Sequence, residues 1–83
     1  MRYLIMCRSL TYAQRAARVL ERAGIGAGII KAPVGLTGNG CSYCVTVSIG
    51  KGQGAVNILR TENLLQGKVY LQNTDNTTEE VRL

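Results

Sequence analysis

The chain contains no histidine, no phenylalanine and no tryptophan, and it has a single proline. Histidine is the side chain most often used as a general acid or base near neutral pH, so its absence argues against an independent enzyme. Because the largest apolar side chains are missing, the core must be built from leucine, isoleucine, valine and alanine. No apolar stretch reaches the ~18 residues that a bilayer-spanning helix needs, so we expect no membrane association.

The length of 83 residues predicts one small domain with a modest core. Apolar residues make up 46% of the chain, which is too much for intrinsic disorder. The opening sequence MRYLIMCRSL is interrupted by Arg8, and no small-residue cleavage site follows, so it does not resemble a secretory signal. A chain with cysteines and no such signal is expected in the reducing cytosol.

Ten basic residues face five acidic ones, which gives a net charge of +5. Such a balance raises nucleic acid as a partner, but the charges are scattered and no basic–aromatic interleaving is present, so we do not favour it. The one dense basic group is Arg15, Arg18 and Arg22, whose spacing places them on one flank of a helix. This flank is either a solvated helix face or a docking patch for an acidic partner.

Hydrophobic periodicity predicts four strands and two helices. The strands are expected over 2–8, 27–32, 42–49 and 68–73, and the helices over 9–24 and 50–67. Their order predicts an α+β, ferredoxin-like βαββαβ sandwich with a four-stranded antiparallel sheet, strand order 4-1-3-2, and both helices on one face. We expect residues 1–73 to form this single domain and 74–83 to be a mobile polar tail.

The first helix carries clear boundary signals. Ser9 or Thr11 can cap its start, and Thr11 with Gln14 fits a capping box. Gly24 is expected to end it, because glycine adopts the left-handed conformation at little cost. Gly52 weakens the prediction for the first turn of the second helix.

Three cysteines, two of them in GNGCSYC (38–44), raise four possibilities: a metal site, a redox pair, a sulfur-bearing thiol or a space-filling role. A structural zinc site needs four ligands, and Cys41 and Cys44 supply only half of them, so no metal is predicted within one chain. An extended chain would hold these two residues roughly 10 Å apart, beyond the ~7 Å limit for a disulfide, unless a turn at Ser42 shortens the distance.

The other two cysteines look structural. Cys44 alternates with apolar residues in its strand, so it is expected on the more open sheet face with Thr46 and Ser48. Cys7 ends the first strand and is expected to be a buried filler. With the first and third strands taken as parallel neighbours, Cys7 and Cys41 would lie at opposite ends of the sheet and could not bond.

Cys41 follows a glycine-rich loop, so its thiol can be exposed. The backbone amides of the loop residues can converge as an anion-binding nest, and the end of the neighbouring strand adds positive charge. These binding residues are Gly38, Asn39, Gly40, Ser42 and Lys31. Such surroundings lower a thiol pKa, and the thiolate is the reactive form. Residue chemistry alone leaves this interpretation level with that of a loop cysteine of no consequence.

Residues 2–72 resemble the selenium/sulfur carrier protein-like family of small bacterial proteins. The resemblance lies in the opening strand, the Ala- and Leu-rich helix SLTYAQRAARVLERAGI, a proline after the second strand, Pro33, and the loop cysteine, Cys41, in GCSY. The sequence departs from the family pattern where Ser42 replaces a common glycine and where Cys44 is an additional cysteine.

The resemblance implies that Cys41 carries sulfur or selenium as a persulfide or selenosulfide. A cysteine desulfurase or selenocysteine lyase-type donor would load it, and an acceptor protein would receive the atom. Cys44 would then be a possible resolving thiol, and no cofactor is expected. The alternative is a noncatalytic interaction or regulatory module that dimerises or docks through the open sheet face around Cys44, Thr46 and Ser48.

Overall fold

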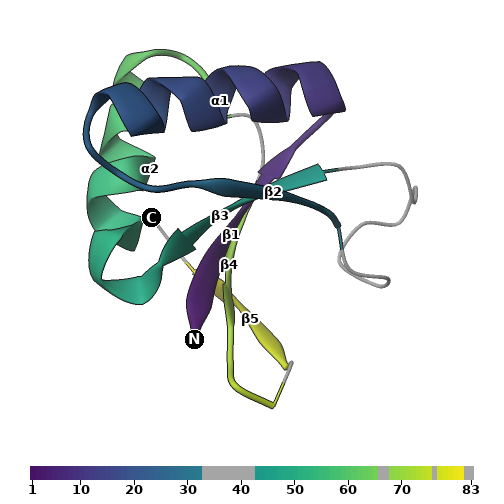
Figure 1. Cartoon of the computed structure of the whole chain (residues 1–83). Coiled ribbons are helices and arrows are strands. Elements are labelled where there is room, and N and C mark those ends of the chain that lie inside the picture. The colour runs from purple at the N-terminus through teal and green to yellow at the C-terminus, as the bar shows by residue number, and fades with distance from the viewer. Residues whose placement is uncertain (33–42, 66–67, 76, 82–83) are drawn as a thin grey trace.

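The computed structural model describes residues 1–32, 43–65, 68–75 and 77–81 of the chain. Five strands and two α-helices make up most of this part (Figure 1). In chain order the elements are β1 (Arg2–Cys7), α1 (Leu10–Arg22), β2 (Gly28–Lys31), β3 (Tyr43–Ser48), the short 3-10 helix η1 (Ile49–Lys51), α2 (Gly52–Thr61), β4 (Val69–Gln72) and β5 (Thr78–Val81). The fold is therefore α+β, as the periodicity predicted.

The strands form one antiparallel sheet in the order β2-β3-β1-β4-β5. The expected order of the first four strands is confirmed, while membership of the ferredoxin-like class stays a prediction. The expected count of four strands is wrong, because Thr78–Val81 pair with β4 where a mobile tail was predicted. The polar sequence hid this strand, whose Val81 packs against the main core.

The turn between β4 and β5 is held by side chains. Thr77 donates from its backbone N and its hydroxyl to one Asp75 carboxylate oxygen, at 3.1 and 2.6 Å. The Asn73 amide donates to the Thr77 hydroxyl at 3.0 Å. The hydrogen bonds from Thr77 hold the pKa of Asp75 below its usual range.

The strand directions correct one expectation about the cysteines. β1 and β3 run antiparallel, and Cys7 at the end of β1 lies opposite Tyr43 at the start of β3. β2 also pairs antiparallel with β3, so β3 lies between β1 and β2 and is antiparallel to both. Cys7 therefore lies at the sheet end where the segment that contains Cys41 joins β3, not at the opposite end.

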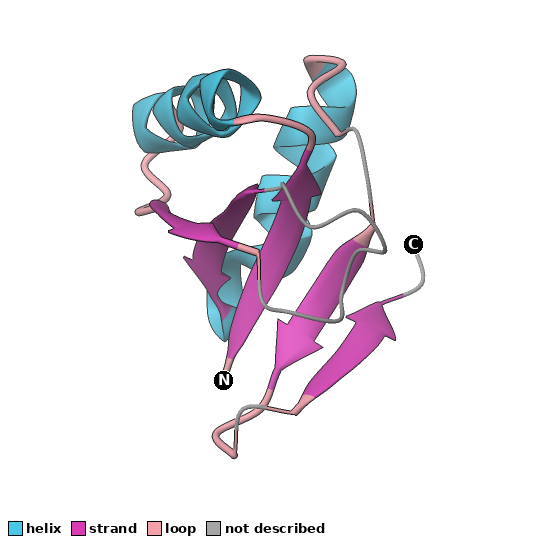
Figure 2. Ribbon diagram, turned by 90° about the vertical axis from the view of Figure 1, so that its right-hand side faces the viewer, coloured by secondary structure: helices cyan, strands magenta, loops and turns pink. Residues whose placement is uncertain are grey.

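Both helices lie on one side of the sheet, and the main core lies between (Figures 1 and 2). We call this side the helix-covered face and the other the helix-free face. The buried residues of the core come from β1, β3 and β4, from both helices and from the turn after α1: Ile5, Cys7, Val45, Val47, Val69, Ala13, Ala16, Leu20, Ala55, Val56, Leu59 and Ile25. Three alanines in α1 are buried, which fits the predicted small-sided stripe of this helix.

The ends of α1 follow from two residues. Ser9 is the N-cap and accepts a hydrogen bond from the Tyr12 backbone N at 3.3 Å, so Thr11 lies inside the first turn and the predicted Thr11–Gln14 capping box is wrong. Gly24 has φ +84°, as expected for a helix end. Ile25 N then donates to the Leu20 carbonyl at 2.9 Å, which is the Schellman pattern.

α2 is shorter than the predicted 50–67, because it ends at Thr61. Asn63, at φ 59°, takes the left-handed position after it, and Leu64 N donates to the Leu59 carbonyl at 2.8 Å. Asparagine tolerates this conformation better than most residues, which is why the helix can end without glycine. The glycine at the start of the helix, Gly52, is buried against the ring of Tyr3.

Candidate thiol site

Cys44 lies on the helix-free face, directly opposite Met6 of β1. It is fully buried in a small cluster with Leu4 and Met6, and its thiol donates to the Met6 thioether sulfur at 3.2 Å. Burial, with a smaller effect of nearby Cys7 and an opposing one of Arg2, raises the pKa of Cys44 to about 11. This thiol is therefore protonated at neutral pH.

The helix-free face was expected to be the more open one, and for Cys44 that expectation is wrong. Ile30 of β2, Tyr70 of β4 and Ala32, which follows β2, pack around the buried cluster. Farther along β3 the face does open, since Thr46 is half-buried and Ser48 is exposed. A resolving role for Cys44 stays a prediction, and it would require this thiol to leave its cluster.

Cys7 is the last residue of β1 and lies on the helix-covered face, where only 2% of it is exposed. The predicted burial is confirmed. Its thiol lies 3.8 Å from the Ile5 carbonyl oxygen, and burial raises its pKa to about 11. At pH 7 a thiol with that pKa is ionised in about one molecule in 10⁴, so it is a poor nucleophile. Cys7 and Cys44 are both free thiols.

The central residue of the predicted site, Cys41, lies outside the described residues, and so do Gly38, Asn39, Gly40 and Ser42. The prediction that these residues form a thiolate site therefore stays a prediction.

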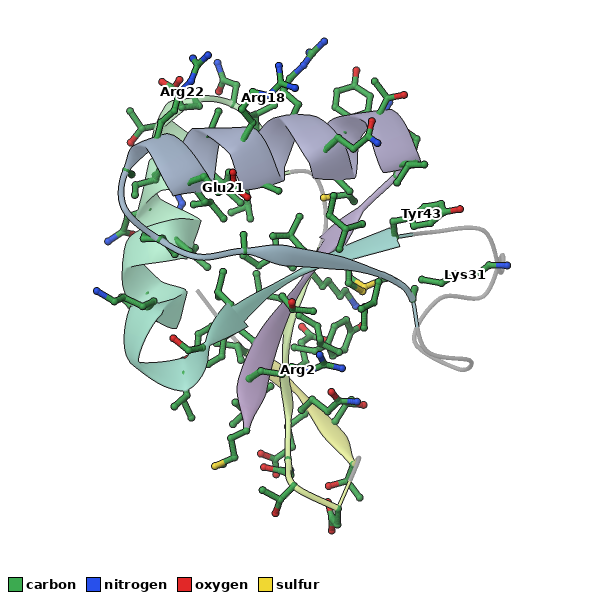
Figure 3. All side chains as sticks on the ribbon, in the orientation of Figure 1. Arg2, Arg18, Glu21, Arg22, Lys31 and Tyr43 are labelled. Carbon is green, nitrogen blue, oxygen red and sulfur yellow. The ribbon has the colours of Figure 1, made fainter. Side chains whose placement is uncertain are left out.

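The other predicted binding residue, Lys31, is described. It is exposed at the end of β2 and pairs in register with Tyr43, the first residue of β3 (Figure 3). Cys41 precedes Tyr43 by two residues in the sequence. The cation that was predicted to flank the thiol is thus at the sheet end where the segment that contains Cys41 joins β3.

A second group of cations lies at the same sheet end, and the sequence reasoning missed part of it. Arg8 follows Cys7, and its guanidinium carbon lies 5.7 Å from the centre of the Tyr12 ring. Arg15 lies 5.6 Å from the same ring centre. The sequence held part of this signal, because Tyr12 and Arg15 are three residues apart on one helix. Arg8 lies before the N-cap of that helix, so its contact with Tyr12 had to come from the structure.

Within the described residues, no group of three or more His, Cys, Asp or Glu side chains could hold a metal ion. Over the same part of the chain, none of the helices has both the length and the apolar character needed to cross a membrane.

Comparison with known proteins gives one match. No curated protein and no solved structure matches the chain. The sequence model of one family does, and it extends over residues 2–71, from the first residue of β1 almost to the end of β4. A match over that much of the chain establishes membership, so this protein belongs to the family described as “Putative Se/S carrier protein-like”.

Proposed function

We propose that this protein carries a sulfur or selenium atom on Cys41 and transfers it between partner proteins. The observation that carries the proposal is the burial of both other cysteines, Cys7 and Cys44, whose raised pKa values keep them protonated. A family of carriers needs one reactive thiol, and Cys41 is the remaining one of the three cysteines in the chain. Elimination and family membership therefore support the same residue.

The proposed loading step is a thiol exchange. The Cys41 thiolate attacks the outer sulfur of a persulfide on the donor enzyme. The S–S bond of the donor breaks, the donor leaves as a thiolate, and the transferred sulfur, with its proton, becomes Cys41–S–SH. Selenium would follow the same path to Cys41–S–SeH. An acceptor thiolate then attacks the outer atom, and Cys41 leaves as a thiolate, so the cycle needs no oxidant or reductant.

Positive charge around the thiol would support its ionised form. Lys31 is exposed and pairs with Tyr43, and Arg8 follows the residue that pairs with Tyr43 across β1 and β3. Both cations therefore lie at the end of the sheet where β3 begins, and Cys41 precedes that start by two residues in the sequence. The amides of Gly38, Asn39 and Gly40 and the Ser42 side chain complete the proposed anion-binding surroundings.

The carrier would work with a donor of the cysteine desulfurase or selenocysteine lyase type and with an acceptor protein. Neither step asks the chain for a general acid of its own, which agrees with a sequence that contains no histidine. A free thiolate persists in reducing surroundings, so we place this activity in the cytosol.

Intact-protein mass spectrometry after incubation with a cysteine desulfurase and cysteine tests the proposal. Wild type should gain about 32 Da, the mass of one sulfur, and Cys41→Ser should gain nothing. Cys7→Ala and Cys44→Ala are the matched controls and should load like wild type. The proposal fails if wild type gains no mass from any donor, or if Cys41→Ser still loads. Loss of release in Cys44→Ala alone would support a resolving role for Cys44.

A noncatalytic interaction module is the alternative, and one observation favours it. The helix-free face carries half-buried Ile30 and Tyr70 beside its buried cluster, with Thr46 and Ser48 farther along. Under this alternative, Cys41→Ser would leave partner binding or self-association unchanged, and Thr46→Arg would abolish it.

A further inference from the structure

The outward side of α1 is a basic surface. Arg15, Arg18 and Arg22 are all exposed, and spacings of three and four residues align them along the helix. Arg18 and Arg22 extend outward from the helix in Figure 3. Arg8, which is exposed just before the helix, extends the row. We call these four residues the arginine surface.

The charge of this surface is not neutralised within the described part of the chain. The ion pair there joins Lys68 to Glu80 at 3.4 Å, on β4 and β5, and none of the four arginines takes part in one. Glu21 is the single acidic residue of α1. Four guanidinium groups therefore face solvent, and Glu21 lies on the side of the helix toward β2, away from Arg18 and Arg22 (Figure 3). A surface with such an excess of positive charge attracts acidic partners and speeds their association.

Two of the four arginines are held before any partner arrives. The Arg8 and Arg15 guanidinium groups each lie within 6 Å of the centre of the Tyr12 ring, at 5.7 and 5.6 Å. Such cation–π contacts restrict flexible side chains at modest energy, which lowers the entropy lost when the arginines bind a carboxylate.

The arginine surface begins next to the end of the sheet where β3 starts, which is the end that follows Cys41 in the sequence. Arg8 follows Cys7, which is paired with Tyr43, the residue that starts β3. Figure 3 shows Tyr43 near the N-terminal end of α1, with Arg18 and Arg22 farther along the helix. A protein bound along α1 would therefore reach the sheet end where the segment that contains Cys41 joins β3.

We infer that the arginine surface is the docking site for an acidic surface of the enzyme that donates sulfur or selenium. This inference rests on the proposed function, because that function requires a protein donor. A protein is chosen over nucleic acid because the arginine surface begins beside the start of β3, two residues after Cys41 in the sequence, and the proposed transfer to Cys41 requires a protein donor there.

The test compares two routes of loading on Cys41, one from a cysteine desulfurase with cysteine and one from inorganic polysulfide, which needs no docking. The Arg15→Gln/Arg18→Gln variant removes two charges from the arginine surface. The Lys51→Gln/Arg60→Gln variant is the matched control, because it removes the same charge from exposed positions of the second helix region. All four side chains are exposed, so both variants should fold, and circular dichroism checks this.

At low ionic strength we expect loading by the desulfurase to slow about tenfold in the Arg15/Arg18 variant and less than twofold in the control. Polysulfide loading should be equal in all three proteins. Added salt should slow desulfurase loading of wild type and reduce the difference in loading rate between wild type and the Arg15/Arg18 variant.

Several results would overturn the inference. Equal rates of desulfurase loading for the Arg15/Arg18 variant and wild type would do so. Loading of wild type by polysulfide but by no desulfurase would also overturn it, while the proposed chemistry of Cys41 would still stand. Binding of a 20-base-pair DNA duplex that the Arg15/Arg18 variant loses would assign the surface to nucleic acid. A salt-sensitive dimer lost in that variant would assign it to a second copy of the chain. Failure of both loading routes on wild type would instead refute the proposed function.

Discussion

The two faces of the sheet each bury one cysteine, but they do so with very different amounts of structure. Cys7 lies in a cluster of twelve buried residues beneath two helices, whereas Cys44 shares its face with two other buried residues, Leu4 and Met6. Both thiols nevertheless have a pKa raised to about 11. Loss of contact with water, and not the thickness of the layer above, sets the reactivity of these thiols.

This comparison bears directly on function. A carrier could use any of three cysteines, but on each face of the sheet burial keeps one thiol protonated at neutral pH. This comparison supports the proposal that Cys41, the remaining cysteine of the chain, is the reactive one. The small cluster of Leu4, Met6 and Cys44 also contributes to stability by an amount that substitutions on the two faces can measure.

The largest effects should come from adjacent residues of β1 that lie on opposite faces. Ile5 and Leu4 are both fully buried. Ile5→Ala should lower the free energy of unfolding by about 4 kcal/mol and Leu4→Ala by about 3 kcal/mol, because the smaller cluster can collapse further into the space left by the lost side chain. Urea denaturation measures both. A cost below about 1 kcal/mol for Leu4→Ala would show that the helix-free face has no real core.

Substitutions that add a methyl group should show a larger difference in stability between the two faces than substitutions that remove side-chain atoms. A Cβ on Gly52 would overlap the ring of Tyr3 on the helix-covered face, so Gly52→Ala should cost about 3 kcal/mol. Gly54→Ala, two residues along the same helix, is the control. Its Cβ would meet only the Ile25 Cδ1 atom at 4.0 Å, and it should stabilise the protein by about 0.5 kcal/mol.

The counterpart on the helix-free face is Gly28, whose added Cβ would lie 2.8 Å from the Thr46 hydroxyl oxygen. Rotation of the threonine side chain can relieve that contact, so Gly28→Ala should cost about 1 kcal/mol or less. Thermal unfolding of the three alanine variants gives the order. Equal losses for Gly52→Ala and Gly28→Ala would mean that the helix-covered face is no more tightly packed than the other.

Much of this architecture was predictable, because hydrophobic periodicity and the residues that end helices and strands both report on local structure. The alternation of Tyr43, Val45 and Val47 gave β3 and its core side, and Gly24 marked the end of α1. The strand β5 was missed since its sequence, TEEV, carries one large apolar residue. What holds it is pairing with β4 and a turn of local hydrogen bonds, which composition does not reveal.

The cover over Cys44 was also missed, although a signal existed. The strand β1 is apolar at successive positions, which is typical of a strand buried on both faces. Reading Leu4 and Met6 together with their cross-strand partners would have indicated a second cluster. Cys41 precedes β3 by two residues in the sequence, but the direction of β1 against β3 had to come from the structure. That direction places Arg8, which follows Cys7, at the end of the sheet where β3 begins.

Replacing each buried thiol by a hydroxyl should lower the free energy of unfolding by less than the alanine substitutions at Ile5 and Leu4, and by different amounts on the two faces. A buried hydroxyl without a good acceptor costs about 1–3 kcal/mol. The hydroxyl introduced by Cys44→Ser would have only the weak Met6 thioether as acceptor, so this variant should lose about 2 kcal/mol. Cys7→Ser should lose about 1 kcal/mol, since the Ile5 carbonyl lies within reach of a donor there. Chemical denaturation in the presence of reductant measures both. The reverse order would indicate that the hydroxyl introduced at position 44 finds a better acceptor than Met6.

The smallest effect is a loss of stability above neutral pH that both faces share. Burial raises the pKa of Cys7 and Cys44 from 9.0 to about 11 in the folded protein. The stabilisation is therefore complete well below pH 9 and is lost as pH rises from 9 to 11, because the unfolded chain releases these protons first. By pH 9, where half of the unfolded-state thiols have ionised, the loss is about 0.4 kcal/mol per thiol.

Urea denaturation at pH 7, 8 and 9, compared between wild type and the Cys7→Ala/Cys44→Ala variant, isolates this contribution, because the two proteins differ only at these two cysteines. Wild type should lose more stability than the variant over this range. Single Cys→Ala variants would divide the difference between the faces, and we expect equal shares, since the two pKa values are equal. An identical pH dependence for wild type and the double variant would mean that both buried thiols ionise as easily as exposed ones, and the argument that singles out Cys41 would then fail.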